Sequence, residues 1–345
     1  MQGVNKRHTI SALLGIGIAA LLIWGLDNND KPKMTYHRNE GKIFGTYYHI
    51  QYESEKDLQD SMQTALQAFD NSLSMFNPHS TLSAINDNRD TTTDAYFEAM
   101  FAEAQRVNEL SGGAFDITVA PLVNYFGFGN RKRVQNTDRS ADRIQTDLDS
   151  LLAFVGMDKV QLVDHRIIKS DPRVQLDGGA VAKGQACDIV ADLLRRNGSE
   201  NYLVEIGGEI VAKGNNSKGD KWHVGITKPV ENEGESLQEV IEVSDICMAT
   251  SGNYRNFYYE GNEKRSHTID PRTGSPVQHS LLSATIISST CMRADAMATA
   301  SMVLGAEKGL EMIEQAGDAA AYYIVAQGDS TVVITSQNWS KMLQK

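Results

Sequence analysis

The sequence predicts an α+β protein in which mostly antiparallel sheets are flanked by helices. Segments with helical spacing of apolar residues are interleaved with pairs of short strands joined by tight turns, not with single strands in strict strand–helix alternation. Hydrophobic residues make up 41% of the 345 residues, which is enough for a well-filled globular core. The length suits one large domain or two of medium size.

In the first part of the chain, a strand is expected at Ile43–Tyr52. A helix is expected at Asp57–Leu73, where apolar residues recur at helical spacing: Leu58, Met62, Leu66, Phe69 and Leu73. The turn-forming segment Asn77–Thr81 ends that helix. The following expected elements are a helix from about Asp94 to Leu110 stopped by Gly112 and Gly113, an exposed loop at Gly127–Asp138, and a helix capped by Ser140 that reaches Phe154 before Gly156.

The rest of the chain continues this mixture of hairpins and helices. The expected hairpins are Lys159–Val163 with Arg166–Lys169, and Tyr322–Ala326 with Thr331–Thr335. The other expected strands are Tyr202–Ile206, Glu209–Ala212, Trp222–Thr227 and Ser283–Ser288. Helices are expected at Gly184–Arg196, Asp295–Leu304 and Lys308–Gln315.

The amino terminus has the charge pattern of an exported segment. Three basic residues, Lys6–His8, precede an apolar run of 17 residues, Ile10–Leu26, and the acidic stretch Asp27–Asp30 follows it. Trp24 and Leu26 occupy the place of a small-x-small cleavage site. We therefore expect residues 1–30 to be an uncleaved anchor, with a cleaved signal as the alternative, residues 31–40 to be a linker, and residues 41–345 to form one domain.

Charge and cysteine content exclude several classes of protein. The net charge of −11 repels nucleic-acid phosphates, and the short basic run Arg131–Arg133 has no interleaved aromatic residues. Cys187, Cys247 and Cys291 are too few and too scattered for a disulfide framework or a zinc site. None of them follows the apolar run, so that position offers no cysteine for a lipid anchor.

Two segments carry residues suited to phosphate chemistry. Asp177–Gly184 combines glycines with Lys183 before an expected helix, an arrangement that attracts anions, although a glycine-rich turn with a surface lysine explains the pattern equally well. In the segment Ser289–Thr299, Asp295 and Thr299 lie four residues apart on one helix face. A carboxylate, a hydroxyl and a main-chain carbonyl suit Mg²⁺, and the alternative is a helix-end charge beside a buried threonine.

Two further segments could contact a substrate. His267, in Lys264–Gly274, could accept a proton from a hydroxyl nucleophile, although a lone histidine is more often structural. Ser111–Asp116 and Phe126–Gly129 combine aromatic faces with open backbone, so a planar ring could stack there, and core packing accounts for the phenylalanines equally well.

Taken together, these segments resemble the ApbE family, the FAD:protein FMN transferases. The resemblance covers Gly41 to about Ser336 and rests on seven motifs in the same order: Ser74–Asn86, Ser111–Pro121, Asp177–Asp188, Glu205–Glu209, Thr250–Tyr254, His267–Pro276 and Ala294–Ala300. It implies an ApbE-like (T-fold-like) architecture. It also implies transfer of FMN from FAD to a threonine hydroxyl of a target protein, with release of AMP.

The resemblance assigns roles to individual residues. It implies that Mg²⁺ is bound by Asp295, Thr299 and the carbonyl of Ala180, and that His267 is the base for the incoming hydroxyl. The implied FAD contacts are Phe44, Phe76, Ala114, Phe115, Asp116, Asp177, Lys183 and Ile269. Membrane electron-transfer proteins are the implied acceptors, and the expected location is the periplasmic side of the inner membrane.

The sequence departs from the family pattern at two places. Many members carry a lipid on a cysteine, which is missing here, and Phe126 stands where many have tryptophan. Two other functions remain open. One is an FAD pyrophosphatase that yields FMN and AMP, and the other is a membrane-tethered flavin-binding protein without turnover.

Overall fold

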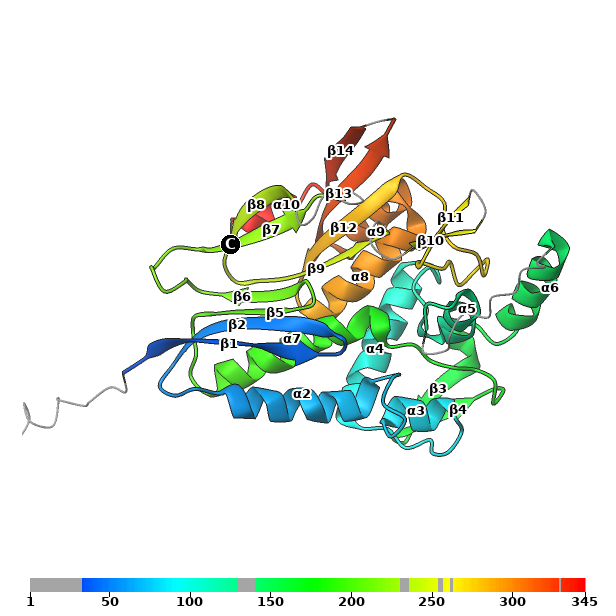
Figure 1. The fold of residues 1–345 in the computed structure, drawn as a ribbon, viewed down its shortest axis with the longest axis horizontal. Coiled ribbons are helices and arrows are strands. Elements are labelled where there is room, and N and C mark those ends of the chain that lie inside the picture. Colours follow the sequence, from blue (N-terminus) through cyan, green and yellow to red (C-terminus); the bar gives the residue numbers. More distant parts are fainter. Residues whose placement is uncertain are drawn as a thin grey trace, which may run out of the picture.

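A wide antiparallel sheet covered by helices dominates the architecture (Figure 1). The computed structural model describes residues 33–129, 140–229, 236–253, 257–260, 263–328 and 330–344, without the side chains of residues 141, 257–260 and 263–265. The expected anchor at residues 1–30 and most of the expected loop at Gly127–Asp138 lie outside the described residues. Among the helices that are described, none is long and apolar enough to cross a membrane.

Eight of the described strands form one sheet in the order β1-β2-β5-β6-β9-β12-β13-β14, with every neighbouring pair antiparallel. In that order the strands span Thr35–Ile43, Thr46–Ser54, Tyr202–Ile206, Glu209–Lys213, Ile246–Gly252, Leu281–Ser288, Ala320–Gln327 and Ser330–Thr335. Three separate hairpins are β3 (Val160–Val163) with β4 (Arg166–Lys169), β7 (Trp222–Thr227) with β8 (Leu237–Val243), and β10 (Phe257–Glu260) with β11 (Glu263–Ser266).

The helices follow a similar scheme in both halves of the sheet. The first half runs β1, β2, helices, β5, β6, and the second runs β9, β12, helices, β13, β14. The helices are α2 (Gln59–Leu73), α3 (Thr81–Asn86), α4 (Ala95–Leu110), α5 (Ala120–Phe126), α6 (Ala141–Leu152), α7 (Gly179–Arg196), α8 (Cys291–Leu304), α9 (Ala306–Ala316) and α10 (Trp339–Leu343), with short 3₁₀ turns η1 (Ile117–Val119) and η2 (Met157–Lys159).

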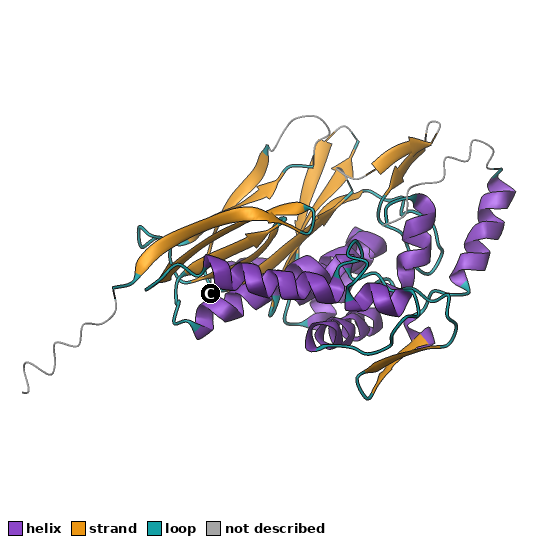
Figure 2. Cartoon of the chain, turned by 60° about the horizontal axis from the view of Figure 1, so that its bottom comes forward, coloured by secondary structure: helices purple, strands orange, loops and turns teal. Residues whose placement is uncertain are grey.

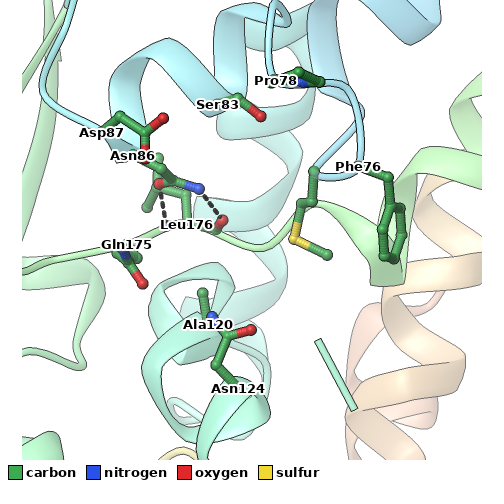
Figure 3. A pocket seen from close by; sticks show the side chains of 10 residues that line it. Phe76, Pro78, Ser83, Asn86, Asp87, Ala120, Asn124, Gln175 and Leu176 are labelled. Atoms are coloured by element: carbon green, nitrogen blue, oxygen red, sulfur yellow. Dashed lines mark hydrogen bonds between the residues drawn. The ribbon is translucent and has the colours of Figure 1, made fainter. Parts of the chain in front are cut away.

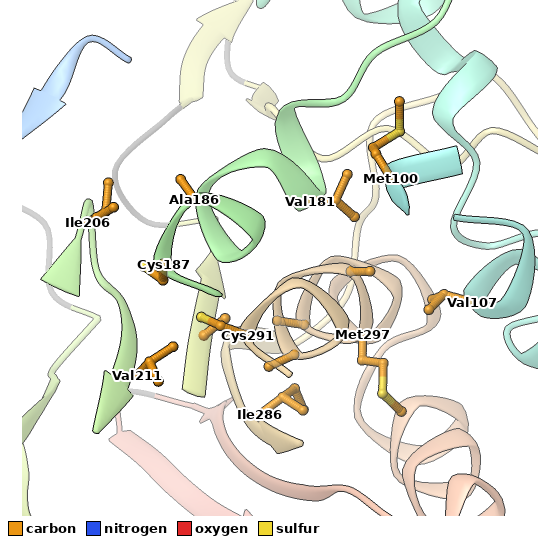
Figure 4. Packing of buried hydrophobic residues seen from close by; sticks show 14 of the residues in the cluster. Met100, Val107, Val181, Ala186, Cys187, Ile206, Val211, Ile286, Cys291 and Met297 are labelled. Carbon is orange, nitrogen blue, oxygen red and sulfur yellow. The ribbon is translucent and has the colours of Figure 1, made fainter. Parts of the chain in front are cut away.

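The main core lies between one face of the sheet and the long helices, which gather along that face (Figure 2). Cys187 on α7 and Cys291 on α8 are buried there together with strand residues such as Ile206 and Ile286 (Figure 4). The opposite face is packed by the β7–β8 hairpin and α10 through Trp222 and other apolar side chains. The central strands β6, β9, β12 and β13 are therefore buried on both faces, whereas the edge strands β1 and β14 have exposed residues.

Helices α7 and α8 make an unusually close contact. A Cβ atom at Gly184 would lie 2.3 Å from the carbonyl oxygen of Cys291, so only glycine fits at this position. On the same side of α7, Asp188 accepts hydrogen bonds from the backbone N–H groups of Cys291 and Met292, both at 2.9 Å. These amides belong to the first turn of α8 and have no partners within the helix. Asp188 thereby fixes the start of α8 against α7.

The structure confirms the α+β class and most of the expected elements, and it corrects others. The expected linker is wrong from Thr35 onward, because β1 begins there and pairs with β2. The strand expected at Ile43–Tyr52 is confirmed from Thr46 onward as β2, but Ile43 ends β1, and Phe44 and Gly45, both with positive φ, form the turn between the two strands. Helices α7 and α8 begin at Gly179 and Cys291, before the expected Gly184 and Asp295.

Candidate active site

A buried cluster of opposite charges lies where α7, α8 and β6 meet. The Lys183 ammonium is 2.5 Å from Oε1 of Glu209 and 3.9 Å from Oδ1 of Asp295. Both carboxylate side chains are almost fully buried, whereas the Lys183 side chain is 34% exposed. Part of the Lys183 side chain therefore reaches solvent, while its ammonium contacts the two buried carboxylates.

Burial and charge act in opposite directions on these groups. Burial opposes the charged form of Lys183, but the nearby carboxylates of Asp295 and Glu209 prevail and raise its pKa well above the usual value, so the side chain is an ammonium at neutral pH. Burial raises the pKa of Asp295 despite the opposing effects of Lys183 and of the Gly184 amide. Additional positive charge would favour ionised carboxylates here.

The three expected magnesium ligands converge on this cluster. Oδ2 of Asp295 accepts a hydrogen bond of 3.1 Å from the Gly184 amide. In an α-helix, the N–H group of one residue points at the carbonyl oxygen four residues earlier, so the Gly184 N–H points at the carbonyl of Ala180. Because the same N–H donates to Asp295, the Ala180 carbonyl and the Asp295 carboxylate lie near each other. Thr299 lies one turn after Asp295 on α8, and its hydroxyl is 3.2 Å from the hydroxyl of Ser251 on β9.

These ligands fit Mg²⁺ by their chemistry. Carboxylate, hydroxyl and carbonyl oxygens are hard donors of the kind that Mg²⁺ prefers. In the described part of the chain, no three His, Cys, Asp or Glu side chains gather in a way that could hold a metal ion. A small set of protein oxygens suits a cation that takes its remaining ligands from water and substrate phosphate.

Two groups of expected FAD contacts lie beside one another: Asp177, just before α7, and the segment Ala114–Asp116. The Asp177 amide donates to the carbonyl of Ile117 at 2.6 Å, which joins this segment to Ala114–Asp116. The Asp177 carboxylate accepts the amide of Gly179 at 2.7 Å, and burial raises its pKa. Ala114 and Phe115 are buried, with Phe115 in the main core, so the Phe115 ring has no exposed face for a flavin.

The Asp116 carboxylate is occupied by hydrogen bonds within the protein. Oδ1 accepts the amide and the hydroxyl of Thr118 at 2.7 and 2.6 Å, and Oδ2 accepts the amide of Met157 at 3.1 Å. Burial raises the pKa of this carboxyl group in spite of these bonds. Asp116 caps η1 and ties it to η2, which holds the neighbouring Ala114–Phe115 backbone in place.

Phe76 borders a cavity of about 340 Å³ between α3, α5 and the segment that leads into α7 (Figure 3). The Phe76 ring is 72% exposed, which is unusual for such a large apolar side chain. Asn86 exchanges two hydrogen bonds with the backbone of Leu176, next to Asp177, and so ties α3 to the entrance of α7. Phe76 can therefore offer a stacking face close to the segment that leads into α7.

Phe44 lies on another side of the site, in the turn between β1 and β2. Its ring meets that of Phe69 edge-on, with centroids 5.5 Å apart. A Cβ atom at Gly207, in the turn between β5 and β6, would lie 2.9 Å from Thr46 and 3.2 Å from Cδ of Lys183. These two turns therefore pack beside the Lys183 side chain.

His267 and Ile269 belong to a loop next to the end of β9. The Thr268 hydroxyl donates to Oδ1 of Asn253 at 2.6 Å. Asn253 lies two residues after Ser251, whose hydroxyl contacts Thr299, so this hydrogen bond connects the loop to the end of β9 near Thr299. His267 is partly buried, and its ring meets Phe128 edge-on with centroids 6.2 Å apart. Ile269 is buried in a small cluster with Leu122 and Phe126.

Three residues of the site were not predicted: Glu209, Ser251 and Asp188. Each lies within one of the motifs recognised in the sequence, so motif membership is the signal that could have identified them. Glu209 was expected only as the first residue of a strand. Its contact with Lys183, 26 positions away, depends on how the β5–β6 hairpin folds over α7.

Comparison with known proteins gives consistent matches over most of the chain. The profile of the ApbE family matches residues 44–323. A Haemophilus influenzae protein named FAD:protein FMN transferase is 35% identical, over 88% of this chain and 90% of its own length. The solved structure of the flavin transferase ApbE from Vibrio cholerae superimposes with a TM-score of 0.79 at 32% identity, covering 90% of this chain and 99% of that one. The apo form of Pseudomonas stutzeri flavinyl transferase ApbE gives 0.80 at 30% identity, covering 92% and 99%.

Proposed function

Because the chain belongs to the ApbE family and is a transferase that acts on FAD and a protein acceptor, we propose that it transfers FMN to a threonine hydroxyl of that acceptor and releases AMP. The cluster of Lys183, Asp295 and Thr299 at the α7–α8 contact carries this proposal. It places the Lys183 ammonium next to hard oxygen ligands, which suits the negative charge of a flavin diphosphate.

Mg²⁺ would be held by Asp295, Thr299 and the Ala180 carbonyl, and it would neutralise negative charge on the diphosphate. Lys183 would contact the same diphosphate, because its side chain is partly exposed beside Asp295. Phe76 would stack on the isoalloxazine ring, and the Ala114–Asp116 backbone, Asp177, Phe44 and Ile269 would line the rest of the FAD site.

The proposed reaction is a single displacement at the phosphorus atom on the FMN side of FAD. The threonine oxygen forms a bond to this phosphorus, and the bridging P–O bond breaks with its electron pair leaving on AMP. His267 takes the proton of the attacking hydroxyl. The protein contributes mainly by positioning the two reactants and by excluding water, which would otherwise take the place of the threonine.

The acceptor threonine must lie in an exposed segment, because its hydroxyl has to reach the flavin phosphate. We propose membrane electron-transfer subunits as acceptors. We also propose that residues 1–30 anchor the enzyme to the inner membrane with residues 41–345 on the periplasmic side, supported by the basic, apolar and acidic order of the amino-terminal residues.

A labelling experiment tests this function. The purified full chain is incubated with FAD, Mg²⁺ and a candidate acceptor, and the denatured products are separated on a gel and imaged for flavin fluorescence. We expect covalent flavin on the acceptor, AMP in equal amount, and loss of both with EDTA. Release of FMN and AMP without labelling would support the pyrophosphatase, and unchanged FAD would support the flavin-binding protein.

A further inference from the structure

Glu209 has one carboxylate oxygen whose surroundings the fold alone does not explain. The side chain is 1% exposed, and Oε1 accepts from the Lys183 ammonium at 2.5 Å. Oε2 is buried and has no hydrogen-bond partner among the described residues. Leaving a buried polar atom unsatisfied is costly, and more so for a charged group, so such an atom calls for a functional explanation.

The charges around this oxygen do not balance. Glu209 and Asp295 contribute two negative charges when ionised, and both approach the single ammonium of Lys183. Ionising both carboxylates would leave one negative charge uncompensated in a buried place, where unpaired charge is costly. A bound cation would balance this charge and give Oε2 a partner.

The backbone around Glu209 holds the carboxylate in this position. The preceding residues, Gly207 and Gly208, both have positive φ and form the tight turn that ends β5 and starts β6. The carbonyl of Glu209 accepts a hydrogen bond from the Cys187 thiol on α7. The carboxylate is thus fixed between the hairpin and α7, on the same side as Lys183.

We propose that Glu209 is a further member of the cation site: its free oxygen binds the hydrated divalent cation that Asp295 holds, and its other oxygen keeps the Lys183 ammonium beside the diphosphate. This inference rests on the proposed function, because it assumes that a divalent cation binds at Asp295. It adds a residue that the metal-ligand pattern of Ala180, Asp295 and Thr299 does not contain.

The test compares Glu209→Gln with Glu205→Gln in the full chain. Both substitutions remove one carboxylate from the same hairpin, but Glu205 instead contacts His49 and the Gly208 amide, away from Lys183. Binding of Mn²⁺, which favours the same oxygen ligands as Mg²⁺, is followed by electron paramagnetic resonance and by calorimetry without FAD. We expect Glu209→Gln to weaken Mn²⁺ binding about 10- to 100-fold and Glu205→Gln to leave it within about twofold.

Thermal unfolding without metal separates a binding role from a structural one. Glutamine keeps the size of Glu209 and its side-chain oxygen can still accept from Lys183, so without metal the Tm of Glu209→Gln should equal that of the wild type, whereas a structural role predicts a lower Tm. Glu209→Asp keeps the charge, and should recover part of the Mn²⁺ affinity. Equal Mn²⁺ affinity in wild type and Glu209→Gln would overturn this inference alone. Absence of Mn²⁺ binding in the wild type, both without and with FAD, would overturn the proposed metal dependence as well.

Discussion

Gly184 on α7 faces the backbone of Cys291 on α8 so closely that a Cβ atom would lie 2.3 Å from the carbonyl oxygen and 2.6 Å from the carbonyl carbon of Cys291. These neighbours are backbone atoms, which cannot rotate away as a side chain could. The contact sets the separation of the helix that carries Lys183 from the helix that carries Asp295. Any residue larger than glycine at position 184 would therefore push α7 and α8 apart and increase the distance between Lys183 and Asp295.

We predict that Gly184→Ala lowers the free energy of unfolding by about 1–3 kcal/mol, because the added methyl group overpacks the helix contact. Gly178→Ala is the control: a Cβ there meets only Leu82, at 3.9 Å, and should cost less than about 1 kcal/mol. Urea denaturation followed by circular dichroism measures both. Equal stability of the two variants would show that the helices can separate without cost.

Asp295→Ala should reduce flavin transfer at least about 100-fold, because it removes the only carboxylate among the three expected magnesium ligands. Asp295→Asn is the informative companion, since its amide oxygen can still accept the Gly184 N–H while the charge is gone. We expect Asp295→Asn to fold normally and to be nearly as inactive. The gel assay reports transfer, and full activity of either variant at ordinary Mg²⁺ would contradict the assigned role.

His267→Ala should slow transfer about 10²- to 10⁴-fold and change FAD affinity by no more than about twofold, because a base acts on the attacking hydroxyl and not on bound FAD. Single-turnover labelling gives the rate, and quenching of flavin fluorescence gives the affinity. A large loss of affinity with an unchanged rate would make His267 a binding residue instead.

Phe76 and Phe115 were both expected to contact FAD, yet the structure exposes one and buries the other. Phe76→Ala should leave stability within about 0.5 kcal/mol and weaken FAD binding about 2- to 12-fold, the effect of losing one stacking face. Phe115→Ala should cost about 3–5 kcal/mol of stability, because its ring fills the core. Thermal melts and FAD titrations of both variants test this contrast, and an unstable Phe76→Ala would refute it.

One ion pair at the turn of the β3–β4 hairpin should make the stability of the fold depend on pH. Nδ1 of His165 is 2.8 Å from Oε1 of Glu98, and this carboxylate raises the pKa of His165 above its usual value. The pair therefore stabilises the fold fully below pH about 6.5, the unfolded pKa, and this contribution is lost as pH rises through the higher folded pKa. Nuclear magnetic resonance titration should give a lower His165 midpoint in Glu98→Gln than in wild type. Identical midpoints would exclude the coupling.

Local sequence signals predicted the elements whose ends are fixed by neighbouring residues. Helix α4 was expected from about Asp94 to Leu110 and spans Ala95–Leu110, because the Asp94 side chain caps its own helix. Ser140 likewise caps α6 by accepting the amide of Arg143. In such cases the residue that sets the boundary is close in sequence, so the pattern alone is sufficient.

The expectations failed where distant residues determine the structure. The start of α8 at Cys291 was missed although Thr290 is a local signal that caps it by accepting the Arg293 amide. Its docking depends on Asp188, over 100 positions earlier, which accepts two amides of the first turn. The turn at Phe44 was missed because phenylalanine rarely adopts positive φ. Asp295 and Thr299 could be paired from the sequence because a spacing of four residues is a local helical signal, whereas the approach of Glu209 to Lys183 depends on tertiary packing.

The way the site is shared between the two halves of the sheet has a consequence for refolding. Lys183 and Glu209 come from the first half, Asp295 and Thr299 come from the second, and only three residue pairs between β6 and β9 join the halves in the sheet. A chain with one half formed therefore has no catalytic centre. Recovery of flavin transfer after dilution from denaturant should follow the docking of the halves, and should lag behind the return of strand and helix signals.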